Sequence, residues 1–161
     1  MQQIEKRLAE LGIDLPAAAA PAGNYVAYTI SGSQVFISGQ LPIENGSMAV
    51  KGILGDDLDI DDGYRAARLC ALNLLAQLRV ACDGNLDRVS RVLKLGGFVR
   101  STPAFVEAPK CINGASDLMV ELFGEAGSHA RFAVSVASLP AGAAVEVDGI
   151  FEIDASDRRA V

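Results

Sequence analysis

Apolar residues recur with a helical period at the start of the chain and with a strand period soon afterwards. The helical period precedes Gly12, and the residues that carry it are Ile4, Leu8 and Leu11. We predict a short amphipathic helix there, followed by a linker over residues 16–23, which contain two prolines and no period. Residues 25–30 and 34–38 are rich in β-forming residues and flank a Ser-Gly-Ser turn, which predicts a hairpin.

A second helix is predicted after residue 63, because apolar and polar side chains lie on opposite sides of a helical projection. The apolar side consists of Tyr64, Ala67, Ala71, Leu74, Leu75 and Leu78. We expect Gly84 to end this helix. The run 89–99 is strand-like, and within it Gly96 and Gly97 indicate either a bulge or a place where another group approaches the backbone closely.

Residues 101–116 contain two prolines and no regular period, so we predict a long loop of the kind often kept for function. A third helix is expected next, and its apolar positions are Leu118, Met119, Leu122 and Phe123. Strands over residues 131–137 and 144–153 follow. This order of elements predicts an α+β fold in which helices pack on one face of a mixed β-sheet.

The other face of such a sheet is expected to be apolar and uncovered. If side chains alternate along the last two strands, four valines cannot all lie beneath the helices of one subunit. These residues are Val134, Val136, Val145 and Val147. We therefore expect a symmetric homo-oligomer in which a second copy covers this face.

The length of 161 residues and a hydrophobic content of 50% fit one domain with a sizeable core. The net charge of −6 and the lack of a Lys/Arg cluster argue against a nucleic-acid partner. No stretch of about 18 apolar residues is present, so we expect no membrane partner, and the first residues lack a secretory signal pattern. The three cysteines lack C-x-x-C spacing and predict a reducing, cytoplasmic location; they are Cys70, Cys82 and Cys111.

Aspartates alternate at Asp57, Asp59 and Asp61, like the start of a calcium-binding loop. The pattern then fails, because Asp62 takes the place of the turn glycine and Arg68 that of the closing glutamate. We expect these carboxylates to face the N–H groups at the start of the second helix instead. We therefore expect no metal site, and no motif in the sequence calls for a cofactor.

Arg131 stands at the start of an otherwise apolar strand. It is either a structural residue, solvated or paired with an acid such as Glu146, or a residue that grips a ligand carboxylate through two parallel N–H donors. His129 is the single histidine of the chain, but the sequence identifies no catalytic partner for it. We do not expect catalysis at His129.

Three segments resemble the Rid family, also called the YjgF-like or L-PSP group. "ARFAVSVASLPAGAAVEVDGI" resembles its C-terminal signature, "ISGQLPI" the end of one of its strands, and "GNLDRVSRVLKLGGFV" its Gly-x-Leu-x-x-Val segment. The match covers most of residues 24–153 in the right order. We therefore divide the chain into an N-terminal helix and linker (1–23), a Rid-like domain (24–154) and a tail (155–161).

The resemblance implies a chorismate-mutase-like fold and a homotrimer with sites in the clefts between subunits. It also implies hydrolysis of reactive 2-imino and 2-enamino acids to 2-keto acids and ammonia. On this basis Arg131 binds the substrate carboxylate, Tyr25 and Asn113 are further substrate-binding residues, and Glu146 is the catalytic residue near the imine. The implied partner is a small-molecule carboxylate.

Two departures from the family leave the activity open. Ala133 stands where family deaminases have a small polar residue, and the 101–116 loop is longer than theirs. Three functions remain as alternatives: an imine deaminase, a non-catalytic module that binds small carboxylates such as 2-keto acids, and an L-PSP-type endoribonuclease. The negative charge and the lack of base-stacking aromatic clusters argue against the endoribonuclease.

Overall fold

The computed structural model describes residues 3–154, so the predicted tail over 155–161 lies outside the described residues. The helices are α1 Gln3–Glu10, α2 Ile60–Ala81 and α3 Ala108–Phe123, with short 3₁₀ turns η1 Leu86–Arg88, η2 Gly124–Gly127 and η3 Pro140–Gly142. The strands are β1 Tyr28–Ser31, β2 Gln34–Gln40, β3 Ile43–Glu44, β4 Ser47–Met48, β5 Val89–Arg100, β6 Ala130–Val136 and β7 Val145–Ile153.

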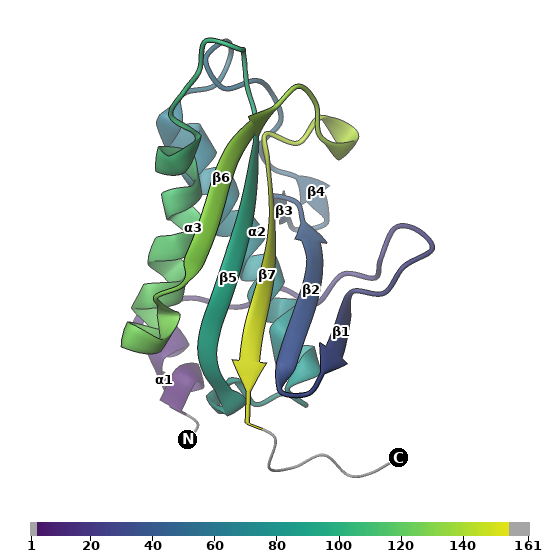
Figure 1. The fold of residues 1–161 in the computed structure, drawn as a ribbon, viewed down its shortest axis with the longest axis vertical. Coiled ribbons are helices and arrows are strands. Elements are labelled where there is room, and N and C mark those ends of the chain that lie inside the picture. Colours follow the sequence, from purple (N-terminus) through teal and green to yellow (C-terminus); the bar gives the residue numbers. More distant parts are fainter. Residues whose placement is uncertain (1–2, 155–161) are drawn as a thin grey trace.

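Five strands form one mixed sheet in the order β1-β2-β7-β5-β6, and β3 pairs with β4 separately. Only β5 and β6 run parallel within this sheet; the other neighbouring pairs are antiparallel. Figure 1 views the sheet from its uncovered side, with α2 and α3 behind it. The predicted α+β fold with helices on one face of a mixed sheet is confirmed.

The predicted hairpin is present but starts later than expected. Strand β1 begins at Tyr28 and returns through a turn at Gly32, which adopts a left-handed φ of 60°. The preceding residues stay outside the sheet ladder, yet they run beside β2, because the Ser38 Oγ donates a hydrogen bond to the Val26 carbonyl at 2.7 Å. Tyr25 therefore lies in an irregular segment next to the end of β2.

The acidic stretch starts α2, as expected. Asp59 caps the helix: its Oδ1 accepts from the Asp62 N–H at 3.0 Å, and Asp62 Oδ2 accepts from the Asp59 N–H at 3.0 Å. This reciprocal arrangement satisfies two N–H groups that the first turn of a helix leaves without a partner. Among residues 3–154, no group of three or more His, Cys, Asp or Glu side chains is placed to hold a metal ion.

The prediction of a long loop over residues 101–116 is wrong, because α3 begins at Ala108. Pro109 lies in the first turn, where its missing N–H has no partner to lose. Gly114 lies where α3 crosses α2, and a Cβ there would collide with the Tyr64 carbonyl oxygen. Proline and glycine argued against a helix here, but the proline occupies a position normal for the start of a helix and the glycine allows a close contact between two helices.

At the two glycines of β5, other side chains approach the backbone closely, which was one of the two predicted alternatives. A Cβ on Gly97 would lie 2.6 Å from the Ile112 side chain of α3, and one on Gly96 would lie 2.5 Å from the Phe132 ring. The register shifts of β5 lie elsewhere, between Val89 and Lys94. The missing side chains let α3 approach the sheet on one face and let the Phe132 ring lie close to Gly96 on the uncovered face.

The four valines of the last two strands lie on opposite faces of the sheet, two on each face, as the alternation of side chains requires. Val145 and Val147 are fully buried beneath the helices, whereas Val134 on the uncovered face is 44% exposed. Phe98 and Phe132 pack edge to face beside it, with ring centroids 5.2 Å apart. None of the described helices is long and apolar enough to cross a bilayer.

Candidate functional site

Arg131 lies on the edge strand β6 and points to the side of the sheet that the helices cover. The register pairs Glu146 with Phe98 and Phe98 with Val134, so these three share the uncovered face. Arg131 is three positions from Val134 and therefore faces the opposite way. At this edge α3 runs alongside β6, so the Arg131 side chain meets the helix.

Two residues of α3 hold the Arg131 guanidinium. Its Nη1 donates to Asn113 Oδ1 at 2.9 Å and to Ser116 Oγ at 3.1 Å. Asn113 and Ser116 are three residues apart in the helix and so lie on one side of it. The predicted substrate-binding residues Arg131 and Asn113 are therefore brought together by direct contact.

Ser116 also contacts the single histidine. Its Oγ lies 2.9 Å from His129 Nε2, and His129 Nδ1 lies 2.6 Å from the Gly127 carbonyl oxygen. Both side chains are half-buried. A chain of hydrogen bonds thus runs from Arg131 through Ser116 and His129 to the backbone.

Arg131 has no acidic partner among residues 3–154, since its contacts are the neutral groups of Asn113 and Ser116. The alternative of an ion pair with Glu146 within one chain is therefore wrong. The guanidinium lies at a half-exposed edge, and no carboxylate of the described residues pairs with it. Such a cation has two N–H-bearing nitrogens, Nε and Nη2, left to pair with an anion.

Glu146 lies on the uncovered face, in the middle strand β7. It fits above a bulge of β2, where Ile37 pairs with Gly149 but Gln40 pairs with Val147. A Cβ on Gly39 would collide with the Glu146 carboxylate, so the glycine at this bulge makes room for it.

Two carboxylates share this face of β7, the half-buried Glu146 and the more exposed Asp148. Burial raises the pKa of Glu146, and the nearby charge of Asp148 raises it further. Burial also raises the pKa of Asp148, against the lowering effects of the Gly96 N–H and of Lys94. A carboxyl group with a raised pKa keeps more of its proton toward neutral pH, which suits it to proton transfer.

Tyr25 is 51% exposed and lies beside the same end of β2. The link is indirect: Val26 follows Tyr25 and is bonded to Ser38, which precedes Gly39 at the bulge. Among residues 3–154, the Tyr25 hydroxyl accepts only a long contact from the Ala22 N–H, at 3.4 Å. Within the same described residues, Tyr25 makes no hydrogen bond with either Arg131 or Glu146.

Of the predicted site residues, Arg131 and Asn113 are thus in direct contact, whereas Glu146 lies apart from them, against Gly39. Arg131 pairs with Leu95, and Leu95 with Gly149, three positions along β7 from Glu146. The Arg131 and Glu146 Cα atoms are thus roughly 10 Å apart along the strands and roughly 10 Å apart across two strand spacings. They also face opposite sides of the sheet, so one small ligand does not touch both within a single chain.

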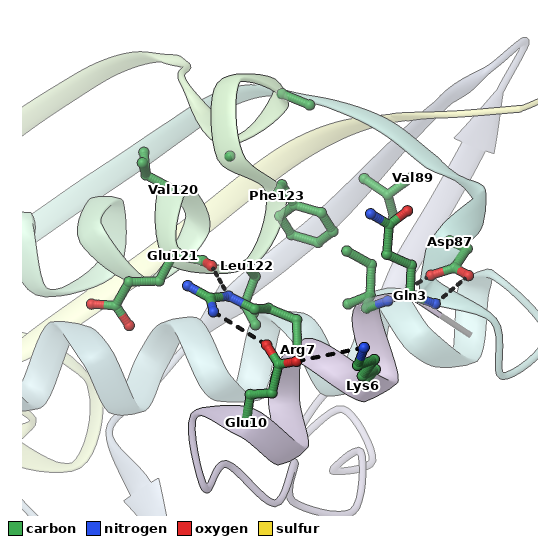
Figure 2. A pocket seen from close by; sticks show the side chains of 13 residues that line it. Gln3, Lys6, Arg7, Glu10, Asp87, Val89, Val120, Glu121, Leu122 and Phe123 are labelled. Carbon is green, nitrogen blue, oxygen red and sulfur yellow. Dashed lines mark hydrogen bonds and ion pairs between the residues drawn. The ribbon is translucent and has the colours of Figure 1, made fainter. Parts of the chain in front are cut away.

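A pocket of about 640 Å³ lies elsewhere, between α1, the C-terminal half of α3 and the start of β5 (Figure 2). Its polar groups already bind one another: Arg7 Nε donates to the Glu121 carbonyl at 3.0 Å, and Asp87 accepts from the Gln3 N–H at 2.7 Å. None of the predicted site residues lines it. We assign it the structural role of docking α1 onto α3.

Sequence reasoning missed Ser116 and the use of His129. Ser116 was missed because the predicted loop over 101–116 gave it no defined side, so it could not be aligned with Asn113. The spacing of Asn113 and Ser116 is the signal that a helical reading of residues 108–116 would have used. The contact with His129, 13 residues away, depends on how α3 packs beside β6.

Comparison with known proteins places the chain among close relatives. A family model described as "YjgF/chorismate_mutase-like, putative endoribonuclease" matches residues 5–151. Protein TCP17 of Trypanosoma cruzi is 52% identical over 153 residues, which span 94% of this chain and 95% of that protein.

Solved structures share the fold over the same length. The protein Atu1372 with unknown function from Agrobacterium tumefaciens is 54% identical with a TM-score of 0.88, covering 94% of this chain and 92% of its own. A "putative endoribonuclease" from Shewanella oneidensis is 40% identical with a TM-score of 0.91, covering 94% of this chain and all of its own. TdcF from E. coli with bound serine is 25% identical with a TM-score of 0.61, covering 85% of this chain and 94% of its own.

Proposed function

The chain belongs to the YjgF/chorismate-mutase-like family, which is also called the Rid family, and from this premise we propose that it hydrolyses small 2-imino and 2-enamino acids. Water adds to the imine carbon, the carbon–nitrogen bond breaks, and a 2-keto acid and ammonia are released. The observation that carries the proposal is Arg131, a half-exposed guanidinium held by neutral groups and facing no acid of residues 3–154. Such a cation is suited to a substrate carboxylate, which it binds through two parallel hydrogen bonds.

Glu146 is the residue that we propose for proton transfer. Burial and Asp148 raise the pKa of its carboxyl group, so the group is better matched to accepting and returning a proton near neutral pH. The room that Gly39 leaves lets the carboxylate lie against the backbone of β2, and Glu146 stays partly exposed, so we take its solvent-facing side as open. The attacking water is expected on that open side.

We propose that the complete site is formed between subunits of a homotrimer. Arg131 and Glu146 lie on opposite faces of the sheet, so a ligand that meets both needs residues of two copies. The uncovered face supports association, because Phe36 is 38% exposed and Val134 is 44% exposed there. Light scattering is expected to give the mass of a trimer at micromolar concentration, and a monomer would contradict both the assembly and the shared site.

The test of the activity is a coupled assay in which 2-aminoacrylate is generated and the appearance of pyruvate is followed. Wild-type protein is expected to speed pyruvate formation above the spontaneous rate. Glu146→Gln should remove about 10²- to 10⁴-fold of that acceleration, the range typical of one general acid or base. Glu152→Gln is the matched control, because Glu152 lies on the same face of β7 but away from Gly39. An equal loss in both variants, or none in either, would contradict the role of Glu146.

A non-catalytic module that binds small carboxylates is the second candidate, and Ala133 favours it. Ala133 follows Arg131 on the same face of β6 and packs against the hydrophobic core, so it offers a ligand no side-chain hydrogen bond. The serine bound to TdcF supports small-molecule binding in this family without implying turnover here. Binding of pyruvate by calorimetry without any acceleration of 2-aminoacrylate hydrolysis would favour this module.

The endoribonuclease named for several relatives is not the function that we propose. The chain carries a net charge of −6, whereas RNA is bound by cations and by aromatic platforms on which bases stack.

We also propose a reducing, cytoplasmic setting. All three cysteines are free and buried. Burial raises the pKa of Cys82 and of Cys111 to about 11, so their thiols stay protonated and unreactive.

A further inference from the structure

The hydrogen bonds around Arg131 are unequally distributed over its guanidinium. Both N–H groups of Nη1 are used, one by Asn113 Oδ1 and one by Ser116 Oγ. Nε and Nη2 have no hydrogen-bond partner within residues 3–154. A carboxylate that binds through two parallel hydrogen bonds therefore meets the edge formed by Nε and Nη2.

The hydrogen bonds from Arg131 through Ser116 and His129 end at the Gly127 carbonyl, and this acceptor determines which atom donates in each of them. The Gly127 carbonyl can only accept, so His129 Nδ1 carries a proton and donates to it. In a neutral imidazole Nε2 is then an acceptor, and the Ser116 hydroxyl donates to it. With its proton committed to His129, the Ser116 oxygen keeps its lone pairs directed for the Arg131 Nη1–H.

We propose that Ser116 and His129 are positioning residues, which orient Arg131 so that its Nε/Nη2 edge faces the carboxylate of a 2-keto or 2-imino acid. The inference rests on the proposed carboxylate-binding role of Arg131. His129 acts through Ser116 and does not touch the ligand. Without the histidine the Ser116 hydroxyl is free to rotate, and its proton can point at Nη1 and repel it.

The first test uses nuclear magnetic resonance. The chain contains a single histidine, so every histidine ring signal belongs to His129. Long-range proton–nitrogen correlations on 15N-labelled, ligand-free wild type at alkaline pH, where a histidine ring is neutral, report which ring nitrogen carries the proton. The proposal expects the Nδ1–H form. A ring in the Nε2–H form would overturn it.

The second test measures 2-oxobutanoate binding by calorimetry. Ser116→Ala and His129→Leu are expected to weaken binding about five- to tenfold, the loss typical of one hydrogen bond. His129→Gln should recover most of the affinity, because its amide oxygen can replace Nε2 as the acceptor for Ser116. Ser135→Ala is the matched control, since Ser135 lies on the same face of β6 but outside the chain of contacts, and its affinity should equal that of the wild type.

The outcomes separate the two proposals. Normal binding by folded Ser116→Ala and His129→Leu proteins would overturn the positioning role, and thermal unfolding of each variant verifies that it is folded. If the ring is in the Nδ1–H form but wild type does not bind 2-oxobutanoate, the carboxylate-binding role of Arg131 is what fails, and the positioning role falls with it. If wild type binds and the ring is in the Nε2–H form, Arg131 keeps its role and the positioning by His129 is refuted.

Discussion

Replacing Arg131 with lysine separates a ligand-binding role from a structural one. The change keeps the positive charge but exchanges a rigid fork of five donors for one mobile ammonium group. In the folded chain Nη1 alone contacts Asn113 and Ser116, at 2.9 and 3.1 Å. An ammonium has three N–H donors, so it can keep those contacts or turn to a ligand, but it cannot reproduce the Nε/Nη2 edge.

The expected magnitude follows from this division of donors. Loss of one charge-assisted hydrogen bond to a carboxylate costs about 1.5 to 3 kcal/mol, which weakens 2-keto acid binding roughly ten- to a hundredfold. The free energy of unfolding should fall by less than about 1 kcal/mol, because Arg131 is half-exposed and no buried acid loses its partner. Binding and stability are therefore expected to respond very differently.

The assay pairs calorimetric titration with pyruvate and thermal unfolding, each on wild type, Arg131→Lys and Arg91→Lys. Arg91 is an exposed arginine of β5, and its substitution controls for the general effect of an Arg-to-Lys change on a strand. Stable Arg131→Lys protein with weakened binding supports the ligand role. An unstable variant whose folded fraction binds as well as wild type would refute the reasoning.

Three further predictions concern the rest of the molecule. Because burial raises the pKa of Glu146, its ionisation opposes folding: unfolding free energy should fall as the pH rises from the ordinary carboxyl pKa through the raised one. Glu146→Gln should flatten this fall in urea unfolding, and an unchanged pH profile would contradict the assignment. Calcium at millimolar concentration should leave the melting temperature unchanged, because Asp59 and Asp62 are committed to the helix cap; a rise of several degrees with calcium but not magnesium would be the opposing result. Gly114→Ala should destabilise the protein by roughly 1 to 3 kcal/mol, since its Cβ would collide with the Tyr64 carbonyl, and wild-type stability in chemical unfolding would show that the helices can move apart.

Much of the fold was readable because its signals are local. The apolar stripe of α2 and the carboxylates before it lie within a few turns of helix, so their period and their capping role need no knowledge of distant residues. Arg131 stood out for the same reason, as one charge in an apolar strand. Local patterns also explain why the start of α3 was taken for a loop: Pro109 and Gly114 are poor residues for a helix interior in isolation, and the sequence alone does not reveal that one occupies the first turn and the other a helix crossing.

The site depended on information that only the tertiary structure holds. Whether Arg131 and Glu146 face each other is decided by strand order and register, and a shift of one residue would turn every side chain of a strand to the other face. The alternative of an ion pair between them is wrong within one chain, because two strand spacings and the sheet itself separate the two side chains. Ser116 contacts Arg131 and His129 because α3 packs beside β6. These segments are distant in sequence, and no periodic pattern of residues predicts their contact. The sequence by itself thus determined most of the elements and singled out Arg131 as a charge in an apolar strand, whereas packing across the sheet decided what that residue touches.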